Sequence, residues 1–331
     1  MSAPHPQLSA DTQSSPIEEV DIDAAGGTSP VSRVVDIDGI PMSGLLLEVP
    51  EPRAVIVALH GGATSSAYWD CPGHPELSMM RSAAARGYTV VALDRPGYGA
   101  SRPHAEELAP VHRRVDLMFA ALGQFLGTRS RGAGIFLWGH SVGCEVTVRM
   151  AIDDRADDVL GVELAGTGRE HHAAAAGILG TPGQYADARG VGELLWTPID
   201  LYPPEIVGGA LIASPTPRYE GTVTAGWPRT DFPALAAEVR VPVHFTAGEY
   251  EKVWRNDPQA LADVAGMFGA APRVVTDRLP GGGHNLSIGY AAPRYHSGIL
   301  GFVDECTDAA LTATETTAAD LISATYGTED R

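Results

Sequence analysis

A serine with a glycine two positions away on either side is the residue of this sequence best suited to chemistry. It lies at position 141 in the motif GHSVG, residues 139–143, which matches the pattern G-x-S-x-G. The apolar run 135–138 precedes the motif, and apolar residues at helical spacing follow it. A strand, a sharp turn and a helix in this order expose a serine hydroxyl above the edge of a sheet. We therefore predict that Ser141 is a catalytic nucleophile.

A serine that attacks an acyl carbon also needs N–H donors for the negative charge that develops on the acyl oxygen. The predicted turn places the backbone amide of Val142 at a helix N-terminus, where unpaired N–H groups and the helix dipole favour an anion. A second glycine-rich turn, HGGA at residues 60–63, follows another predicted strand. We expect its Gly62 amide to be the second donor, with the Ala63 amide as the alternative.

A base must accept the serine proton, because a hydroxyl is a weak nucleophile near neutral pH. Of the 11 histidines, His284 is the best placed. It ends the loop GGGH, residues 281–284, which follows the last predicted strand, and the glycines let this loop reach over the sheet edge. The other histidines, His140 beside the nucleophile included, are predicted to be structural or solvated.

A carboxylate must in turn orient the histidine ring. The chain order serine, acid, histidine makes the loop after the predicted strand 241–246 its natural source. That loop contains GEYE at residues 248–251, which offers Glu249 and Glu251. The pattern by itself leaves both open.

Short β-branched runs that alternate with helical patterns must position these residues. They predict an α/β fold, a mostly parallel eight-stranded sheet flanked by helices. The runs lie at residues 31–37, 45–49, 54–59, 89–93, 135–138, 160–164, 241–246 and 273–279. Two apolar stripes at helical spacing, residues 108–125 and 261–268, predict helices that cross the sheet.

The gap between the sixth and seventh predicted strands, about 75 residues, exceeds what a crossover helix needs. It predicts a helical lid or cap insertion, and its aromatic residues Trp196, Tyr202 and Trp227 are candidates for a substrate pocket. The predicted domains are a disordered acidic leader, a core in two parts, the lid between them and an acidic tail. Their ranges are 1–30, then 31–165 with 236–304, then 166–235, and finally 305–331.

Composition excludes several function classes. A net charge of −18 over 331 residues argues against nucleic-acid binding, and no apolar run is long enough to span a membrane. The three cysteines offer neither a disulfide framework nor a paired metal site, so a reducing cytoplasm is expected. No metal-binding or dinucleotide-binding motif appears, and we expect no metal and no cofactor. Oligomeric state is left open.

The motifs together resemble the α/β-hydrolase fold family. They are HGG, DRPGYGAS at residues 94–101, GHSVG, GEYE and GGGH, in this order along residues 31–304. The resemblance implies a triad of Ser141, His284 and an acid, and it favours Glu251 over Glu249, because Glu251 holds the position where most members have Asp. It also implies that Asp94 is structural. Two departures are the Glu itself and the small residues Gly62 and Ala63 in place of bulkier ones.

The function expected from this resemblance is hydrolysis of an ester or thioester through an acyl-enzyme. Alternatives on the same triad are a thioesterase or acyltransferase, or a carbon–carbon bond hydrolase of secondary metabolism, and a non-catalytic binding module is the minor alternative. The expected partner is a small acyl substrate. The lid aromatics and the acidic body favour an apolar or mixed substrate over a strongly anionic one.

Overall fold

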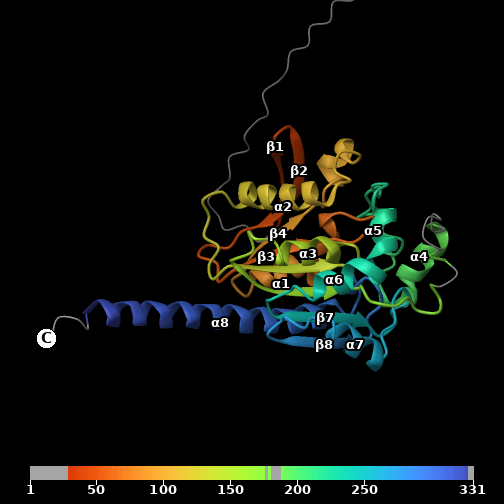
Figure 1. Ribbon diagram of the computed structural model, residues 1–331. Coiled ribbons are helices and arrows are strands. Elements are labelled where there is room, and N and C mark those ends of the chain that lie inside the picture. Colours follow the sequence, from red (N-terminus) through yellow and green to blue (C-terminus); the bar gives the residue numbers. More distant parts are fainter. Residues whose placement is uncertain (1–28, 176–177, 180–187, 327–331) are drawn as a thin grey trace, which may run out of the picture.

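The computed structural model describes residues 29–175, 178–179 and 188–326. Its centre is one eight-stranded sheet with the order β1-β2-β4-β3-β5-β6-β7-β8 (Figure 1). The strands are β1 (Val31–Ile37), β2 (Ile40–Leu47), β3 (Val55–Leu59), β4 (Thr89–Leu93), β5 (Ile135–His140), β6 (Val159–Ala165), β7 (Val243–Gly248) and β8 (Val274–Leu279). Strands β3 to β8 pair in parallel, which confirms the predicted mostly parallel sheet. The leader predicted for residues 1–30 lies outside the described residues as far as residue 28.

The first two strands form an antiparallel hairpin, and β2 also pairs antiparallel with β4. β2 begins at residue 40, five residues earlier than predicted. Asp38 and Gly39 make the turn with φ of +52° and +87°, the combination that Asp-Gly turns of hairpins adopt. Because this turn fixes the register, Pro41 and Gly44 are carried into the strand although both disfavour it.

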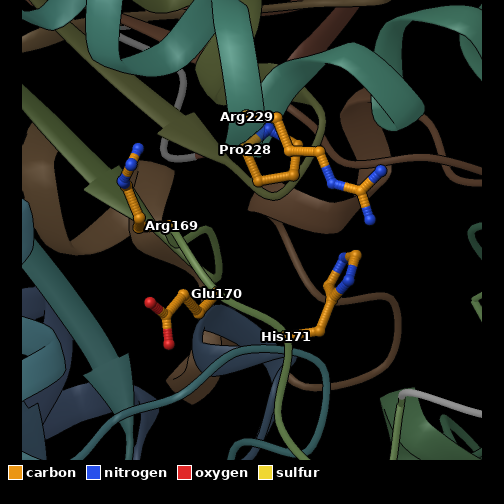
Figure 2. A pocket seen from close by; sticks show the side chains of 5 residues that line it. All are labelled: Arg169, Glu170, His171, Pro228 and Arg229. Atoms are coloured by element: carbon orange, nitrogen blue, oxygen red, sulfur yellow. The ribbon is translucent and has the colours of Figure 1, made fainter.

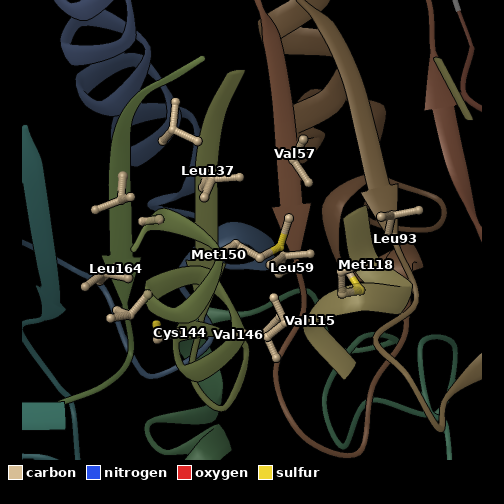
Figure 3. Close-up of a cluster of buried hydrophobic side chains, with 14 of the residues drawn as sticks. Val57, Leu59, Leu93, Val115, Met118, Leu137, Cys144, Val146, Met150 and Leu164 are labelled. Carbon is tan, nitrogen blue, oxygen red and sulfur yellow. The ribbon is translucent and has the colours of Figure 1, made fainter. Parts of the chain in front are cut away.

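Helices cover both faces of the sheet. They are α1 (Met79–Ala84), α2 (Val111–Leu126), α3 (Gly143–Ala151), α7 (Pro258–Ala265) and α8 (Ala292–Tyr326), with short helices η1 (Ser66–Trp69), η2 (Pro75–Leu77), η3 (Gly99–His104) and η6 (Leu286–Ile288). Alternate residues of β3 point to opposite faces: Val57 packs in the cluster with α2 and α3, and Ile56 in the cluster with α1 and α8. Figure 3 shows the first cluster, where Met118 of α2 and Met150 of α3 lie against the strands.

Helix α2 begins later than its predicted apolar stripe, and α8 includes part of the predicted tail. Pro110 precedes the first residue of α2, so Leu108 lies outside the helix although its side chain is buried in the same cluster. At the other end of the chain, α8 runs through residue 305, where the acidic tail was predicted to begin, and ends at Tyr326 (Figure 1). None of the helices in the described ranges combines the length and the hydropathy needed to cross a bilayer.

The described part of the chain between β6 and β7 forms a set of short helices. They are α4 (Ala188–Trp196), η4 (Ile199–Leu201), α5 (Glu220–Gly226), η5 (Trp227–Asp231) and α6 (Phe232–Ala236). Figure 1 shows α4 and α5 at one end of the sheet. Because β3 to β8 are parallel, this segment and the loops that follow β3, β5 and β7 all leave from the carboxyl ends of neighbouring strands.

Candidate active site

Ser141 occupies a tight turn between β5 and α3. Its φ is +53°, a left-handed backbone conformation that is strained for a serine, and its N–H donates to the carbonyl of Ala165 at 2.7 Å. A side chain at Gly139 would overlap Thr147, and one at Gly143 would overlap the Leu59 carbonyl. The two glycines of the motif are therefore required by close packing, which holds the serine at the carboxyl edge of the sheet.

His284 and Glu251 meet Ser141 at this edge. His284 Nε2 lies 3.2 Å from Ser141 Oγ, and His284 Nδ1 lies 3.0 and 2.9 Å from the two carboxylate oxygens of Glu251. The histidine and the glutamate are buried, whereas the serine is partly exposed. The structure thus brings together one hydroxyl, one imidazole and one carboxylate that the sequence separates by up to 143 positions.

The Glu251 carboxylate is held in its ionised form. Burial alone would raise its pKa, but the adjacent His284, which bonds to it, and the Val253 N–H, which donates to Oε1 at 2.7 Å, outweigh burial and lower the pKa. An ionised acceptor at Nδ1 keeps the proton on that nitrogen and leaves Nε2 free to accept the serine proton.

Glu249, the alternative acid, lies in another environment. Its Oε2 accepts from the Gly281 N–H at 2.9 Å, and its Oε1 lies 3.7 Å from Arg278. The carboxylate therefore holds the start of the GGGH loop and does not bond to the His284 ring. Of the two candidates, only Glu251 is in contact with the imidazole.

The turn at residues 60–63 approaches Ser141 from β3. A Cβ on Gly61 would lie 3.1 Å from Ser141 Cβ, and one on Gly62 would lie 3.5 Å from a methyl group of Val142. No described residue accepts a hydrogen bond from the amides of Gly62 and Val142, whereas the Ala63 amide donates to the Tyr98 hydroxyl at 3.3 Å. Gly62 and Val142 thus have free N–H groups beside the serine, and the alternative donor Ala63 does not.

A buried cluster that sequence reasoning missed holds this turn. The Arg95 guanidinium donates to the carbonyls of His60 and Gly61 at 2.6 and 2.9 Å and pairs with Glu220 of α5 at 2.5 Å. The Tyr98 hydroxyl donates to the same carboxylate at 2.7 Å. Burial alone would lower the pKa of Arg95. The nearby Glu220 charge outweighs burial and raises the pKa, so the guanidinium stays charged. Arg95 and Tyr98 lie in the motif DRPGYGAS, and this motif is the sequence signal that could have pointed to the cluster.

Loss of the Tyr98 hydroxyl should impair catalysis through this turn. In Tyr98→Phe the Ala63 amide and Glu220 each lose a partner, so the Gly62 amide is no longer fixed, and we expect kcat of a reaction at Ser141 to fall about 10-fold with KM little changed. Tyr88→Phe is the matched control, because Tyr88 is equally buried and its hydroxyl donates to Asp304 of α8 at 2.6 Å. Equal losses of kcat in both variants would show that only stability is affected.

The three aromatic residues predicted to line a substrate pocket make contacts within the protein. The Tyr202 hydroxyl accepts from the Asn285 N–H at 3.3 Å, and Trp196 packs edge-on against Tyr202 with ring centroids 5.1 Å apart. Trp227 donates from Nε1 to Thr167 Oγ1 at 2.9 Å. Tyr202 therefore supports the His284 loop and Trp227 the end of β6. Their contact with a substrate stays a prediction.

Two further histidines lie close to Ser141 and His284. His140 donates from Nε2 to the His284 carbonyl at 3.0 Å and stacks on Tyr68, and burial lowers its pKa. His60 accepts from the Arg95 N–H at 3.0 Å, and burial lowers its pKa to about 3. Both rings are neutral supports of the loops that carry them. Over the described ranges, no group of three or more His, Cys, Asp or Glu residues is arranged to hold a metal ion.

Comparison with known proteins agrees with this architecture. The model of the Alpha/beta hydrolase family matches residues 56–294. The chain belongs to this family. It is 40% identical over 79 residues to Protein ABHD14A of Danio rerio, and the match covers 24% of this chain and 27% of that protein. The chain thus matches only about a quarter of the length of this curated relative.

Solved structures share the fold of this alpha/beta hydrolase. A soluble variant of monoglyceride lipase from Saccharomyces cerevisiae has a TM-score of 0.63 at 14% identity, covering 85% of this chain and 96% of that chain. The thioesterase domain from the curacin biosynthetic pathway has a TM-score of 0.56 at 19% identity, covering 82% and 99%. At these identities the likeness shows the fold alone. The family match, with hydrolases among the structural neighbours, supports a hydrolase.

Proposed function

We propose that the chain is a serine hydrolase that cleaves a carboxylic ester or thioester through an acyl-enzyme. The observation that carries the proposal is the continuous contact from Glu251 through His284 to Ser141 Oγ. An imidazole that accepts from the serine hydroxyl and is oriented by a buried carboxylate is the arrangement that makes serine nucleophilic near neutral pH.

The first half of the reaction acylates the serine. Ser141 Oγ attacks the acyl carbon while its proton moves to His284 Nε2, and the amides of Val142 and Gly62 stabilise the negative charge on the acyl oxygen. The imidazolium, stabilised by Glu251, then gives its proton to the departing alcohol or thiol. The bond to the leaving group breaks, and the acyl group remains on Oγ.

The second half releases the acid. A water molecule gives a proton to His284 Nε2 and attacks the acyl carbon, and the same two amides stabilise the second oxyanion. The proton returns to Ser141 Oγ as the acyl bond breaks. Neither half requires a metal or a cofactor.

An ester and thioester panel tests this function. Purified protein is expected to hydrolyse p-nitrophenyl esters or acyl thioesters, and prior reaction with a fluorophosphonate is expected to stop this turnover, because the reagent modifies activated serines. Hydrolysis that persists after complete modification would contradict the proposal, as would a panel without any turnover. The ratio of thioester to ester rates then separates a thioesterase from an esterase.

A further inference from the structure

A pocket lined by cationic side chains lies between the loop after β6 and the helical segment η5. Its volume is about 420 Å³, and its lining residues are Arg169, Glu170, His171, Pro228 and Arg229 (Figure 2). Residues 169–171 follow β6, and residues 228–229 belong to η5. The pocket is thus formed by the strand end next to the triad and by the segment inserted between β6 and β7.

The charge of this pocket is positive although the whole chain carries −18. Arg169 and Arg229 are exposed and form no ion pair with any residue that the structure describes. The acidic residue of the lining is neutralised elsewhere, because the Glu170 carboxylate pairs with Arg255 at 2.5 Å. Figure 2 shows this carboxylate turned away from the His171 ring and the Arg229 guanidinium. Two guanidinium groups and an imidazole are therefore left for a ligand.

The loop that carries His171 is held firmly by the chain that follows the triad acid. The Arg255 N–H donates to the Glu170 carbonyl and the His172 N–H donates to the Val253 carbonyl, each at 2.9 Å. The His171 ring stacks on Trp254 with centroids 4.6 Å apart. This wall is fixed before any ligand binds, which lowers the entropic cost of binding.

The same loop connects the pocket to the triad. A Cβ on Gly166 would lie 3.4 Å from His284 Cε1, and His171 follows Gly166 by five positions. Even fully extended, five residues span at most about 18 Å. The opposite wall is tied to this loop as well, because Trp227, which opens η5, donates to Thr167. A group bound in the pocket therefore lies within reach of a molecule whose carbonyl is at Ser141.

We propose that this pocket binds an anionic group, a carboxylate or a phosphate, carried by the substrate of the Ser141 site. The inference rests on the proposed function and names its substrate class, and it departs from the apolar or mixed substrate expected from the composition. Arg169 and Arg229 supply charge-assisted hydrogen bonds to the anion. Burial, together with the charge of Arg229, lowers the pKa of His171, so a neutral ring is available as a further N–H donor.

Matched substrate pairs test the pocket. p-Nitrophenyl monoesters of linear dicarboxylic acids of increasing length are compared with neutral counterparts whose second carboxylate is methylated. A second arm compares thioesters of a phosphorylated thiol with those of the same thiol without phosphate. At one optimal length, we expect kcat/KM to be about 10-fold higher for the anionic member of a pair. The arm that shows this preference tells whether the acyl group or the leaving group carries the anion.

Arginine variants show whether the preference comes from this pocket. Arg169→Gln and Arg229→Gln are each expected to remove most of it, through KM, while the rate on the neutral member stays unchanged. Arg240→Gln is the matched control, because Arg240 is exposed at the opposite end of the sheet, before β7. If neither arm shows a preference for the anionic substrate, the proposal is overturned. A preference that persists in the protein carrying both Arg169→Gln and Arg229→Gln would also overturn it.

These experiments distinguish a wrong assignment of the pocket from a wrong assignment of the function. If neutral esters are hydrolysed in a Ser141-dependent manner without anionic preference, the pocket assignment is wrong and the function stands. If the protein shows no hydrolysis, calorimetry measures whether it binds the free dicarboxylic acids. Binding that Arg229→Gln abolishes, in a protein without hydrolytic activity, would uphold the anion site and reject the function.

Discussion

Replacement of Ser141 by alanine is expected to lower kcat for ester hydrolysis about a million-fold. The variant keeps His284 and Glu251 in contact but has no oxygen to attack the acyl carbon. The substituted side chain is smaller and partly exposed, so the free energy of unfolding should change little. The measurement is steady-state hydrolysis of the best ester, together with labelling by a fluorophosphonate, which should also disappear.

Ser82→Ala provides the control for this variant. Ser82 lies in α1, and its hydroxyl bonds to the Ser78 carbonyl of the same segment, so the identical atom is removed far from the triad. The control is expected to keep wild-type kcat and labelling. A Ser141→Ala protein that retained more than a tenth of the wild-type rate would place the nucleophile at another residue.

Replacement of Glu251 by glutamine should have the second largest effect, a fall in kcat of about 10,000-fold. An amide is neutral and cannot stabilise the imidazolium, and its NH₂ group favours the tautomer with the proton on Nε2, which cannot accept the serine proton. KM should stay near the wild-type value, because Glu251 is buried behind the ring and does not reach the substrate side. Both kcat and KM are measured in the same ester hydrolysis assay.

Glu249→Gln is the matched control, since the same substitution is made two residues away. The amide oxygen still accepts from the Gly281 N–H, so kcat is expected to stay within about two-fold of the wild-type value. A large loss in Glu249→Gln together with a small one in Glu251→Gln would reverse the assignment of the acid.

Much of the α/β core could be predicted from the sequence, because the patterns that indicate its strands and turns are local. Each of the eight strands follows from a short β-branched run, and the turn that carries Ser141 follows from five consecutive residues, 139–143. The start of β2 could not be predicted from the sequence. The Asp38–Gly39 turn brings Pro41 and Gly44 into strand pairing although both have a low β propensity. Local propensity is a weak guide wherever pairing decides the conformation.

The parts of the site that the sequence did not reveal depend on contacts between distant segments. Glu220 meets Arg95 and Tyr98 across more than 120 positions, and no spacing rule links them. For the same reason the sequence could not decide between the Gly62 and Ala63 amides, because the bond that engages the Ala63 amide comes from the distant Tyr98. The bond from the Trp227 indole N–H to Thr167 likewise could not be read from the sequence, and the contact of Trp227 with a substrate stays a prediction.

A crystal structure of the protein after reaction with a fluorophosphonate tests the central claim most directly, because the phosphonate mimics the tetrahedral intermediate. We predict a covalent bond from phosphorus to Ser141 Oγ, with one phosphonyl oxygen about 2.7–3.1 Å from the amide nitrogens of Val142 and Gly62. His284 should stay in contact with Glu251. Phosphorus on any other side chain, or a phosphonyl oxygen turned away from both amides, would contradict it.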